Sequence, residues 1–186
     1  MFRRRVLPTP EPGLSHPKLT PHVLDFRAPP PLPPVDEVYL ALGMSIKAAG
    51  SRAAFRALDF DANLSVARAA LAAGARRCGL VSAMGADAKS RSFYNRVKGE
   101  AEEALARLPF EGLVIARPSP LVGERGALGK PARAAERVAT AVGRLLGPLV
   151  PASYRPVAAA DVARALLARV LTARGRAVLL SGELQG

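Results

Sequence analysis

Two side chains with complementary proton chemistry lie four residues apart in the segment 92–100. Tyr94 and Lys98 share one face if this segment is helical, because residues i and i+4 stand one above the other on a helix. A free tyrosine, with a pKa of about 10, is a poor proton donor or acceptor at neutral pH. An ammonium group beside it favours the phenolate and lowers that pKa. The spacing therefore indicates a site that moves a proton on or off a carbonyl or an alcohol.

A serine hydroxyl is the third group of this candidate site. Ser82 ends the apolar run 78–82, which reads as a buried strand directly upstream of the helix. From there its hydroxyl is placed to hydrogen-bond the reacting oxygen. The pattern Tyr-x-x-x-Lys also has a purely structural reading, an interfacial tyrosine beside a lysine whose stem covers the same helix face. The rest of the chain decides between these two readings.

The elements around the motif alternate between short apolar runs and helical patterns. Such alternation predicts an α/β fold, Rossmann-like, with a mostly parallel sheet and helices on both faces. Gly43, Ser82 and Pro118 then lie at the carboxyl ends of strands, where ligands bind in such sheets. The predicted strands are 35–43, 78–82, 113–116 and 177–181, and the predicted helices are 51–74 (with a break at 59–61), 93–108, 132–146 and 159–171.

Length and composition indicate one globular domain, residues 1–186, in which 1–35 are irregular and rich in proline. Hydrophobic residues make up 49% of the chain, yet no apolar run is long enough to span a membrane. The basic start is not followed by the apolar segment of a secretory signal. We therefore expect a cytoplasmic protein with no membrane partner. The single cysteine, Cys78, excludes an internal disulfide and a multi-cysteine zinc site, and no metal site is predicted.

The net charge of +12 and the pI near 11.1 raise the question of nucleic-acid binding. The arginines, however, are spread singly among alanines, as expected for solvated helix faces. Aromatic residues make up only 5% of the chain, tryptophan is absent, and no base-stacking platform is visible. The composition argues against nucleic acid as a partner and leaves a small-molecule substrate as the expectation.

Four motifs occur in a fixed order around the candidate site. They are Leu-Gly-x-Ser-Ile-Lys-x-x-Gly-Ser (42–51), Val-Ser-Ala-x-Gly-Ala-Asp (81–87), Phe-Tyr-Asn-Arg-Val-Lys-Gly-Glu (93–100) and Arg-Pro-Ser-x-Leu-x-Gly (117–123). Together they resemble the atypical short-chain dehydrogenase/reductases, and within that family the bacterial branch similar to Tat-interacting oxidoreductases. The resemblance runs from about residue 4 to about residue 171.

The resemblance implies a Rossmann fold that binds NAD(P), with NADP the expected form and NAD the alternative. It implies an NAD(P)-dependent oxidoreductase acting on a carbonyl or alcohol substrate. Tyr94 matches the catalytic acid/base. Lys98 matches the residue that lowers its pKa and holds the nicotinamide ribose, and Ser82 matches the residue that orients the substrate carbonyl.

Further positions match the cofactor-binding residues of the family. Asp25 matches the position that contacts adenine, and Leu42 and Gly43 match the backbone that passes the cofactor. Pro118 matches the loop after the third of the predicted strands. The basic pair formed by Arg4 and Arg5 matches the place where a 2′-phosphate would sit, although a solvated terminus explains the pair equally well.

The sequence departs from the family at its start. The family opens with a strand, a glycine-rich turn and a helix that together receive the pyrophosphate, and this chain shows no such unit. The glycine pattern at 123–129 comes late in the chain and carries Glu124 where phosphate would approach, so we interpret it as a coincidental match. We read the chain as N-terminally truncated and expect it, as written, to bind cofactor poorly and to be inactive.

Functions from three classes stay open at this stage. The first is the oxidoreductase, of which a sugar-nucleotide epimerase is a variant because the same tyrosine and cofactor serve both. The second is a regulatory protein that senses NADP(H) without turnover. The third is a basic nucleic-acid-associated protein, whose DNA binding would depend steeply on salt.

Overall fold

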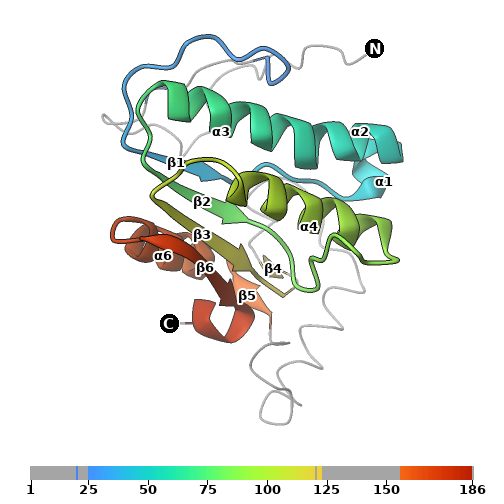
Figure 1. Cartoon of the computed structure of the whole chain (residues 1–186). Helices are drawn as coiled ribbons and strands as arrows, with labels where there is room; N and C mark the ends of the chain where they lie inside the picture. The colour runs from blue at the N-terminus through green and yellow to red at the C-terminus, as the bar shows by residue number, and fades with distance from the viewer. Residues whose placement is uncertain (1–19, 21–24, 120, 123–155, 186) are drawn as a thin grey trace.

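The computed structural model of the chain describes residues 20, 25–119, 121–122 and 156–185. Within these ranges, four strands form one parallel sheet in the order β1-β2-β3-β6 (Figure 1). The strands are β1 (Glu37–Leu40), β2 (Arg77–Val81), β3 (Gly112–Arg117) and β6 (Gly175–Leu180). The predicted α/β fold with a parallel sheet is confirmed.

Helices cover both faces of this sheet. On one face lie α2 (Arg52–Arg56), a π-helix (Ala57–Ala62), α3 (Asn63–Ala72) and α4 (Phe93–Ala106). On the other face lies α6 (Ala159–Val170), which Figure 1 shows behind the sheet. A helix of four residues, α1 (Ile46–Ala49), follows β1, and a 3₁₀ turn (Ser181–Leu184) follows β6.

The central strand β3 shows why the sheet has two cores. Its side chains point alternately to opposite faces, as in any strand. Leu113 and Ile115 join the core under α3 and α4, whereas Val114 and Ala116 join the core under α6. Because β3 is apolar at every one of these positions, the sequence pattern of a strand buried on both faces is confirmed.

Serine side chains cap the starts of α2 and α4. Ser51 accepts a hydrogen bond from the backbone N–H of Ala54, and Ser92 accepts one from the backbone N–H of Asn95. The chain does not break at 59–61 as expected. It continues through those residues as a π-helix, whose wider turns leave Asp59 facing the interior.

Some elements were not predicted, and some predictions lie outside the described residues. Neither α1 nor the short parallel pair formed by β4 (Leu121–Val122) and β5 (Val157–Ala158) was predicted. A two-residue strand is too short to produce a periodic pattern. The predicted helix 132–146 and the glycine pattern at 123–129 lie outside the described ranges.

The loop that follows β2 is held tightly against α4. The backbone N–H of Asp87 donates to the carbonyl of Asn95 at 3.1 Å. Gly85 has a φ of 79°, a conformation that favours glycine. Gly99 lies on the buried face of α4, where an added Cβ would stand 2.2 Å from the backbone nitrogen of Ala88. The two glycines therefore allow the loop after β2 to pack closely against α4.

We expect Gly99→Ala to lower the free energy of unfolding by at least about 2 kcal/mol, because the methyl group has no room against the loop backbone. The loss should occur although alanine favours a helix interior by about 1 kcal/mol over glycine. Urea unfolding measures it, with the exposed Glu103→Ala on the same helix as the control. An unchanged midpoint for Gly99→Ala would contradict the close packing.

Cys78 provides a second test of the core. It is fully buried in β2, and burial raises the pKa of its thiol to about 12. At pH 8 this leaves roughly a thousandth of the thiolate that an ordinary cysteine carries. We therefore expect the folded chain to resist thiol labelling and the urea-unfolded chain to react once per molecule, since Cys78 is the sole cysteine. Rapid labelling without denaturant would show that this core is open.

Candidate active site

Tyr94 lies in the first turn of α4, at the carboxyl ends of the parallel strands. Its ring is half-buried and packs against Phe55 of α2, with 5.3 Å between the ring centroids. No side chain or backbone group among the described residues forms a hydrogen bond with its hydroxyl. The Tyr94 ring is thus held by packing against Phe55, and its hydroxyl can still form a hydrogen bond with a ligand.

Lys98 lies one turn further along α4 and is almost completely buried, with 6% of its surface exposed. Its ammonium nitrogen Nζ forms an ion pair with Oδ1 of Asp59 at 2.5 Å. The second carboxylate oxygen of Asp59, Oδ2, accepts the backbone N–H of Met44 at 3.2 Å. The carboxylate therefore connects the tyrosine-bearing helix to the loop that follows β1.

Sequence reasoning missed Asp59. Asp59 lies where a helix break was expected, and a single buried carboxylate produces no periodic pattern in the sequence. Its neighbour Asn63 holds the π-helix in place by donating from Nδ2 to the carbonyl oxygens of Leu42 (3.2 Å), Leu58 (3.4 Å) and Asp59 (3.0 Å). π-helical turns are rare and often mark functional sites. The π-helix would therefore have pointed to Asp59, but it is visible only in the structure.

The pKa of Tyr94 is shifted opposite to the sequence prediction. Burial raises the pKa of the phenol above its ordinary value of 10.0, and the negative charge of Asp59 raises it further. The lowering expected from Lys98 is wrong for this arrangement, because burial of the phenol and the charge of Asp59 both act in the opposite direction. Tyr94 is therefore protonated at neutral pH and is suited to giving a proton away.

Ser82 belongs to a different cluster. Its hydroxyl donates to Oε1 of Glu102 at 2.5 Å, and Glu102 is fully buried two turns beyond Tyr94 on α4. Eight residues of helix separate these two positions by about 12 Å along the axis. A hydroxyl has one proton, so Ser82 in this arrangement can accept a hydrogen bond from a substrate but cannot donate one. The structure thus brings Tyr94 and Lys98 together with Asp59 and places Ser82 with Glu102.

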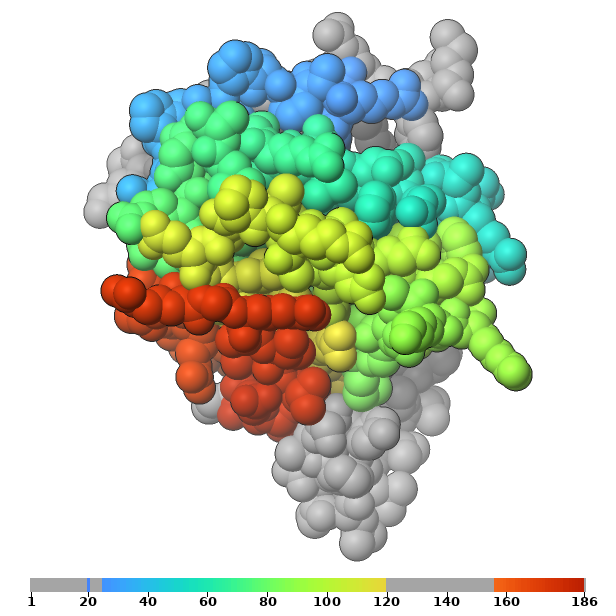
Figure 2. Space-filling view, in the orientation of Figure 1, coloured from blue at the N-terminus to red at the C-terminus, as the bar shows by residue number. Residues whose placement is uncertain are grey.

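Two arginines hold the Glu102 carboxylate. Arg117, the last residue of β3, donates to both of its oxygens, at 3.0 and 2.6 Å. This hydrogen bonding raises the pKa of the Arg117 guanidinium. Arg176 of β6 adds a third contact at 3.5 Å. Figure 2 shows β6 at the surface beside α4, which explains how Arg176 stays exposed while it reaches the carboxylate.

The predicted cofactor-binding positions are distributed unevenly. Gly43 is exposed and lies against the ion pair, since an added Cβ would stand 3.2 Å from Nζ of Lys98 and 3.3 Å from Oδ1 of Asp59. Leu42 precedes it and is held through its carbonyl by Asn63. Gly43 therefore borders the ion pair beside Tyr94, and the cofactor-binding role of these two positions stays a prediction.

Of the four other predicted cofactor-binding positions, two are described and two lie outside the described ranges. Pro118 is buried at the end of β3, where its carbonyl accepts the N–H of Met84 at 3.0 Å. Asp25 is exposed and begins a turn, in which its carboxylate accepts the backbone N–H of Arg27. Arg4 and Arg5 lie outside the described residues.

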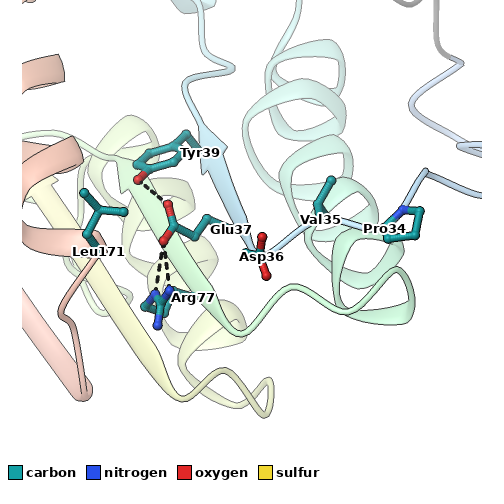
Figure 3. A pocket seen from close by; sticks show the side chains of 7 residues that line it. All are labelled: Pro34, Val35, Asp36, Glu37, Tyr39, Arg77 and Leu171. Carbon is teal, nitrogen blue, oxygen red and sulfur yellow. Dashed lines mark hydrogen bonds and ion pairs between the residues drawn. The ribbon is translucent and has the colours of Figure 1, made fainter. Parts of the chain in front are cut away.

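A hollow of about 650 Å³ lies at the opposite end of the sheet from this site (Figure 3). Its walls include the first residues of β1 and β2, Glu37 and Arg77, which form an ion pair at 3.0 Å. The hydroxyl of Tyr39 donates to the same Glu37 carboxylate, and burial and that hydrogen bond raise its pKa to about 12. Figure 3 shows that Glu37 is bonded to both Arg77 and Tyr39. This hollow is therefore separate from the candidate active site, which lies at the other end of the strands.

Comparison with known proteins supports the fold. No protein-family model matches the chain. Protein FMP52, mitochondrial, of Candida albicans is 44% identical over 90 residues, which are 48% of this chain and 39% of that protein. The corresponding protein of Emericella nidulans is 42% identical over 117 residues, 62% of this chain and 48% of that protein. The chain thus spans less than half the length of these curated relatives.

Two solved structures share the architecture at low identity. RMD from Pseudomonas aeruginosa, complexed with NADPH, superposes with a TM-score of 0.59 at 16% identity, covering 88% of this chain and 68% of that one. MoeE5 in complex with UDP-glucose and NAD gives 0.56 at 16% identity, covering 79% and 56%. The chain therefore shares the Rossmann-like fold of these two proteins. The assignment to the atypical short-chain dehydrogenase/reductases and to their bacterial branch stays a prediction.

The cytoplasmic location expected from the sequence is contradicted by these relatives. The fungal proteins that match the chain at 42–44% identity carry mitochondrial names. The expectation rested on the lack of a recognised signal and of an apolar span, and neither observation separates the cytoplasm from an organelle lumen. Within the described ranges, none of the helices is both long enough and apolar enough to traverse a lipid bilayer.

The Glu102 cluster yields a stability prediction. We expect Glu102→Gln to lower the free energy of unfolding by about 2 kcal/mol, because it leaves Ser82 and two guanidinium groups without their buried carboxylate. The matched control is Glu103→Gln, which removes an exposed carboxylate paired with Arg107 on the same helix and should cost less than about 0.5 kcal/mol. Equal urea midpoints for the two variants would show that the buried cluster contributes nothing.

Proposed function

We propose that the chain carries the proton-transfer half of an NAD(P)-dependent oxidoreductase site that acts on a carbonyl or alcohol substrate. One observation carries the proposal: Tyr94, Lys98 and Asp59 converge at the carboxyl ends of parallel strands, beside the exposed backbone of Gly43. Ligands of open parallel sheets bind at this edge. The activity of the complete protein is part of the same proposal, because the chain spans less than half of its curated relatives.

The residues present fit a nicotinamide cofactor. Lys98 uses its ammonium on Asp59 and retains donors for a ribose hydroxyl, since an ammonium group has three. Gly43 has no side chain between that ammonium and the surface. A bound nicotinamide cofactor supplies or accepts the hydride. NADP is the proposed form and NAD the alternative, and both are found in solved structures of this fold.

The chain's own residues handle the proton. In the direction of carbonyl reduction, hydride addition to carbon leaves a negative charge on the carbonyl oxygen, and Tyr94 donates its phenolic proton to that oxygen. The phenolate that remains lies near the Lys98 ammonium and regains a proton from solvent. Ser82 keeps its predicted role at the substrate oxygen only if its hydroxyl turns away from Glu102. We therefore assign proton donation to Tyr94.

We expect Tyr94→Phe to reduce turnover by about 10²- to 10⁴-fold, the usual contribution of a general acid, while leaving the fold and cofactor affinity unchanged. The measurement is oxidation of NADPH and NADH with a panel of aldehydes and ketones, with UDP-glucose added because MoeE5 binds it. Tyr39→Phe is the matched control, since Tyr39 lies at the other end of the sheet.

The assay is run with the 186-residue chain and with a longer version preceded by a glycine-rich strand-turn-helix. Equal turnover by the wild type and Tyr94→Phe would refute the proposal. Saturable cofactor binding without turnover of any substrate would instead favour the cofactor-sensing alternative.

A further inference from the structure

Two arginines from different helices converge on one aromatic ring next to Tyr94. The guanidinium carbon of Arg52, on α2, lies 5.2 Å from the centroid of the Phe93 ring. That of Arg96, on α4, lies 5.7 Å from the same centroid. Figure 1 shows α2 and the first turns of α4 on the same face of the sheet and at the same end of it. The two arginines are 44 positions apart in the chain, so only this packing brings them together.

The Phe93 ring belongs to the same aromatic group as the candidate proton donor. Phe55 of α2 is fully buried and contacts both rings of α4. Its centroid lies 6.0 Å from that of Phe93 and 5.3 Å from that of Tyr94. Since one side chain packs against both rings, the two guanidinium groups and the phenol belong to one region at the start of α4.

The two positive charges in this region are not neutralised by a carboxylate. Among the residues that the structure describes, neither Arg52 nor Arg96 forms an ion pair, and the neighbouring Glu100 is already paired with Arg56. Like charges repel, and the chain as a whole already carries a net charge of +12. An anion bound by both guanidinium groups would relieve this repulsion.

The ring contact orders each guanidinium without using its hydrogen-bond donors. A cation over an aromatic ring is attracted to the π-electrons, whereas the five N–H groups of arginine point outward in the plane of the guanidinium. Arg96 donates one hydrogen bond from Nη1 to the carbonyl of Ser90 at 2.9 Å. Arg52 is exposed and forms no side-chain hydrogen bond within the described part of the chain. Most of the donors are therefore available to a ligand that matches their planar geometry, such as phosphate.

We propose that Arg52 and Arg96 form a subsite for a phosphate group of the substrate, so that the substrate class is a phosphorylated carbonyl compound. This inference rests on the proposed function. A phosphate carries more charge than a carboxylate and offers oxygens to two guanidinium groups at once. The phosphate binds at the Phe93 ring and leaves the carbonyl end of the substrate to reach Tyr94.

The first test measures anion binding alone, without cofactor or turnover. Inorganic phosphate is titrated into the 186-residue chain at fixed ionic strength and followed by calorimetry, and we expect one saturable site. Arg52→Gln and Arg96→Gln should each raise the Kd by about tenfold or more, the usual effect of losing a charged hydrogen-bond donor.

The matched control is Arg68→Gln, which removes the same charge from an exposed position on α3. It should change the Kd by less than about twofold, because distant surface charges are screened by salt. Arg52→Lys keeps the charge but lacks the planar fork, so it should recover only part of the affinity. An unsaturable wild type, or equal weakening by Arg68→Gln, overturns the inference.

Circular dichroism checks that each variant is folded. Arg52 is exposed, so its variants are expected to fold. If Arg96→Gln does not fold, the comparison of Arg52→Gln with Arg68→Gln decides the test by itself.

Cofactor titrations separate the phosphate of a substrate from that of NADP. NADPH and NADH are titrated against the longer version of the chain, with and without Arg52→Gln. We expect both affinities to stay unchanged. A loss of affinity for NADPH alone would place the 2′-phosphate of the cofactor on Arg52 and overturn the assignment to the substrate.

Turnover provides the last readout, with glyceraldehyde 3-phosphate and glyceraldehyde as a matched pair. We expect Arg52→Gln to raise the KM of the phosphorylated compound by about tenfold at unchanged kcat, the sign of lost uniform binding. The KM of glyceraldehyde should not change. Turnover with no preference for the phosphorylated compound would leave the proposed function standing and overturn the subsite. If no substrate is turned over, the proposed function fails, and the phosphate titration still decides whether the two arginines bind an anion.

Discussion

The buried ion pair between Lys98 and Asp59 is the contact on which the arrangement of the candidate site depends. It joins α4 to the π-helix, and through the second carboxylate oxygen it joins both to the loop after β1. Each ion has lost most of its hydration, so each needs the other in place. Movement of any of the three segments would leave a charge buried without a partner. The position of Tyr94, one turn from Lys98, follows from this constraint.

α4 serves two separate polar clusters from one run of residues. Tyr94, Lys98 and Glu102 are spaced by four, and each step of four advances about 40° around the helix. The run therefore turns from the π-helix, where Lys98 meets Asp59, toward the strands, where Glu102 meets Ser82 and Arg117. The first cluster borders the exposed backbone of Gly43, and the second lies deep between β2, β3 and α4. This division separates the candidate proton-transfer residues from the buried cluster formed by Ser82, Glu102 and Arg117.

Much of the architecture was predictable because it depends on local patterns. Four apolar runs became the four strands of the parallel sheet within one to three residues at each end. The spacing of Tyr94 and Lys98 also identified the helix that carries the site. The π-helix could not be predicted, since its sequence resembles a break and its hydrogen bonds depend on Asn63 reaching across to Leu42.

The sequence by itself determined the alternation of strands and helices, the edge of the sheet at which the motifs gather, and the residue types available for proton transfer. These follow from side-chain periodicity and spacing along one element. Only the tertiary structure decided which charge faces which group. Asp59 lies 39 positions before Lys98 in the chain and contacts it only after folding. Burial of the phenol, together with the charge of Asp59, raises the pKa of Tyr94 where a lowering was expected. The hydrogen bond from Ser82 to Glu102 was likewise not predicted, because electrostatic and hydrogen-bond partners are set by distances in space that no local pattern encodes.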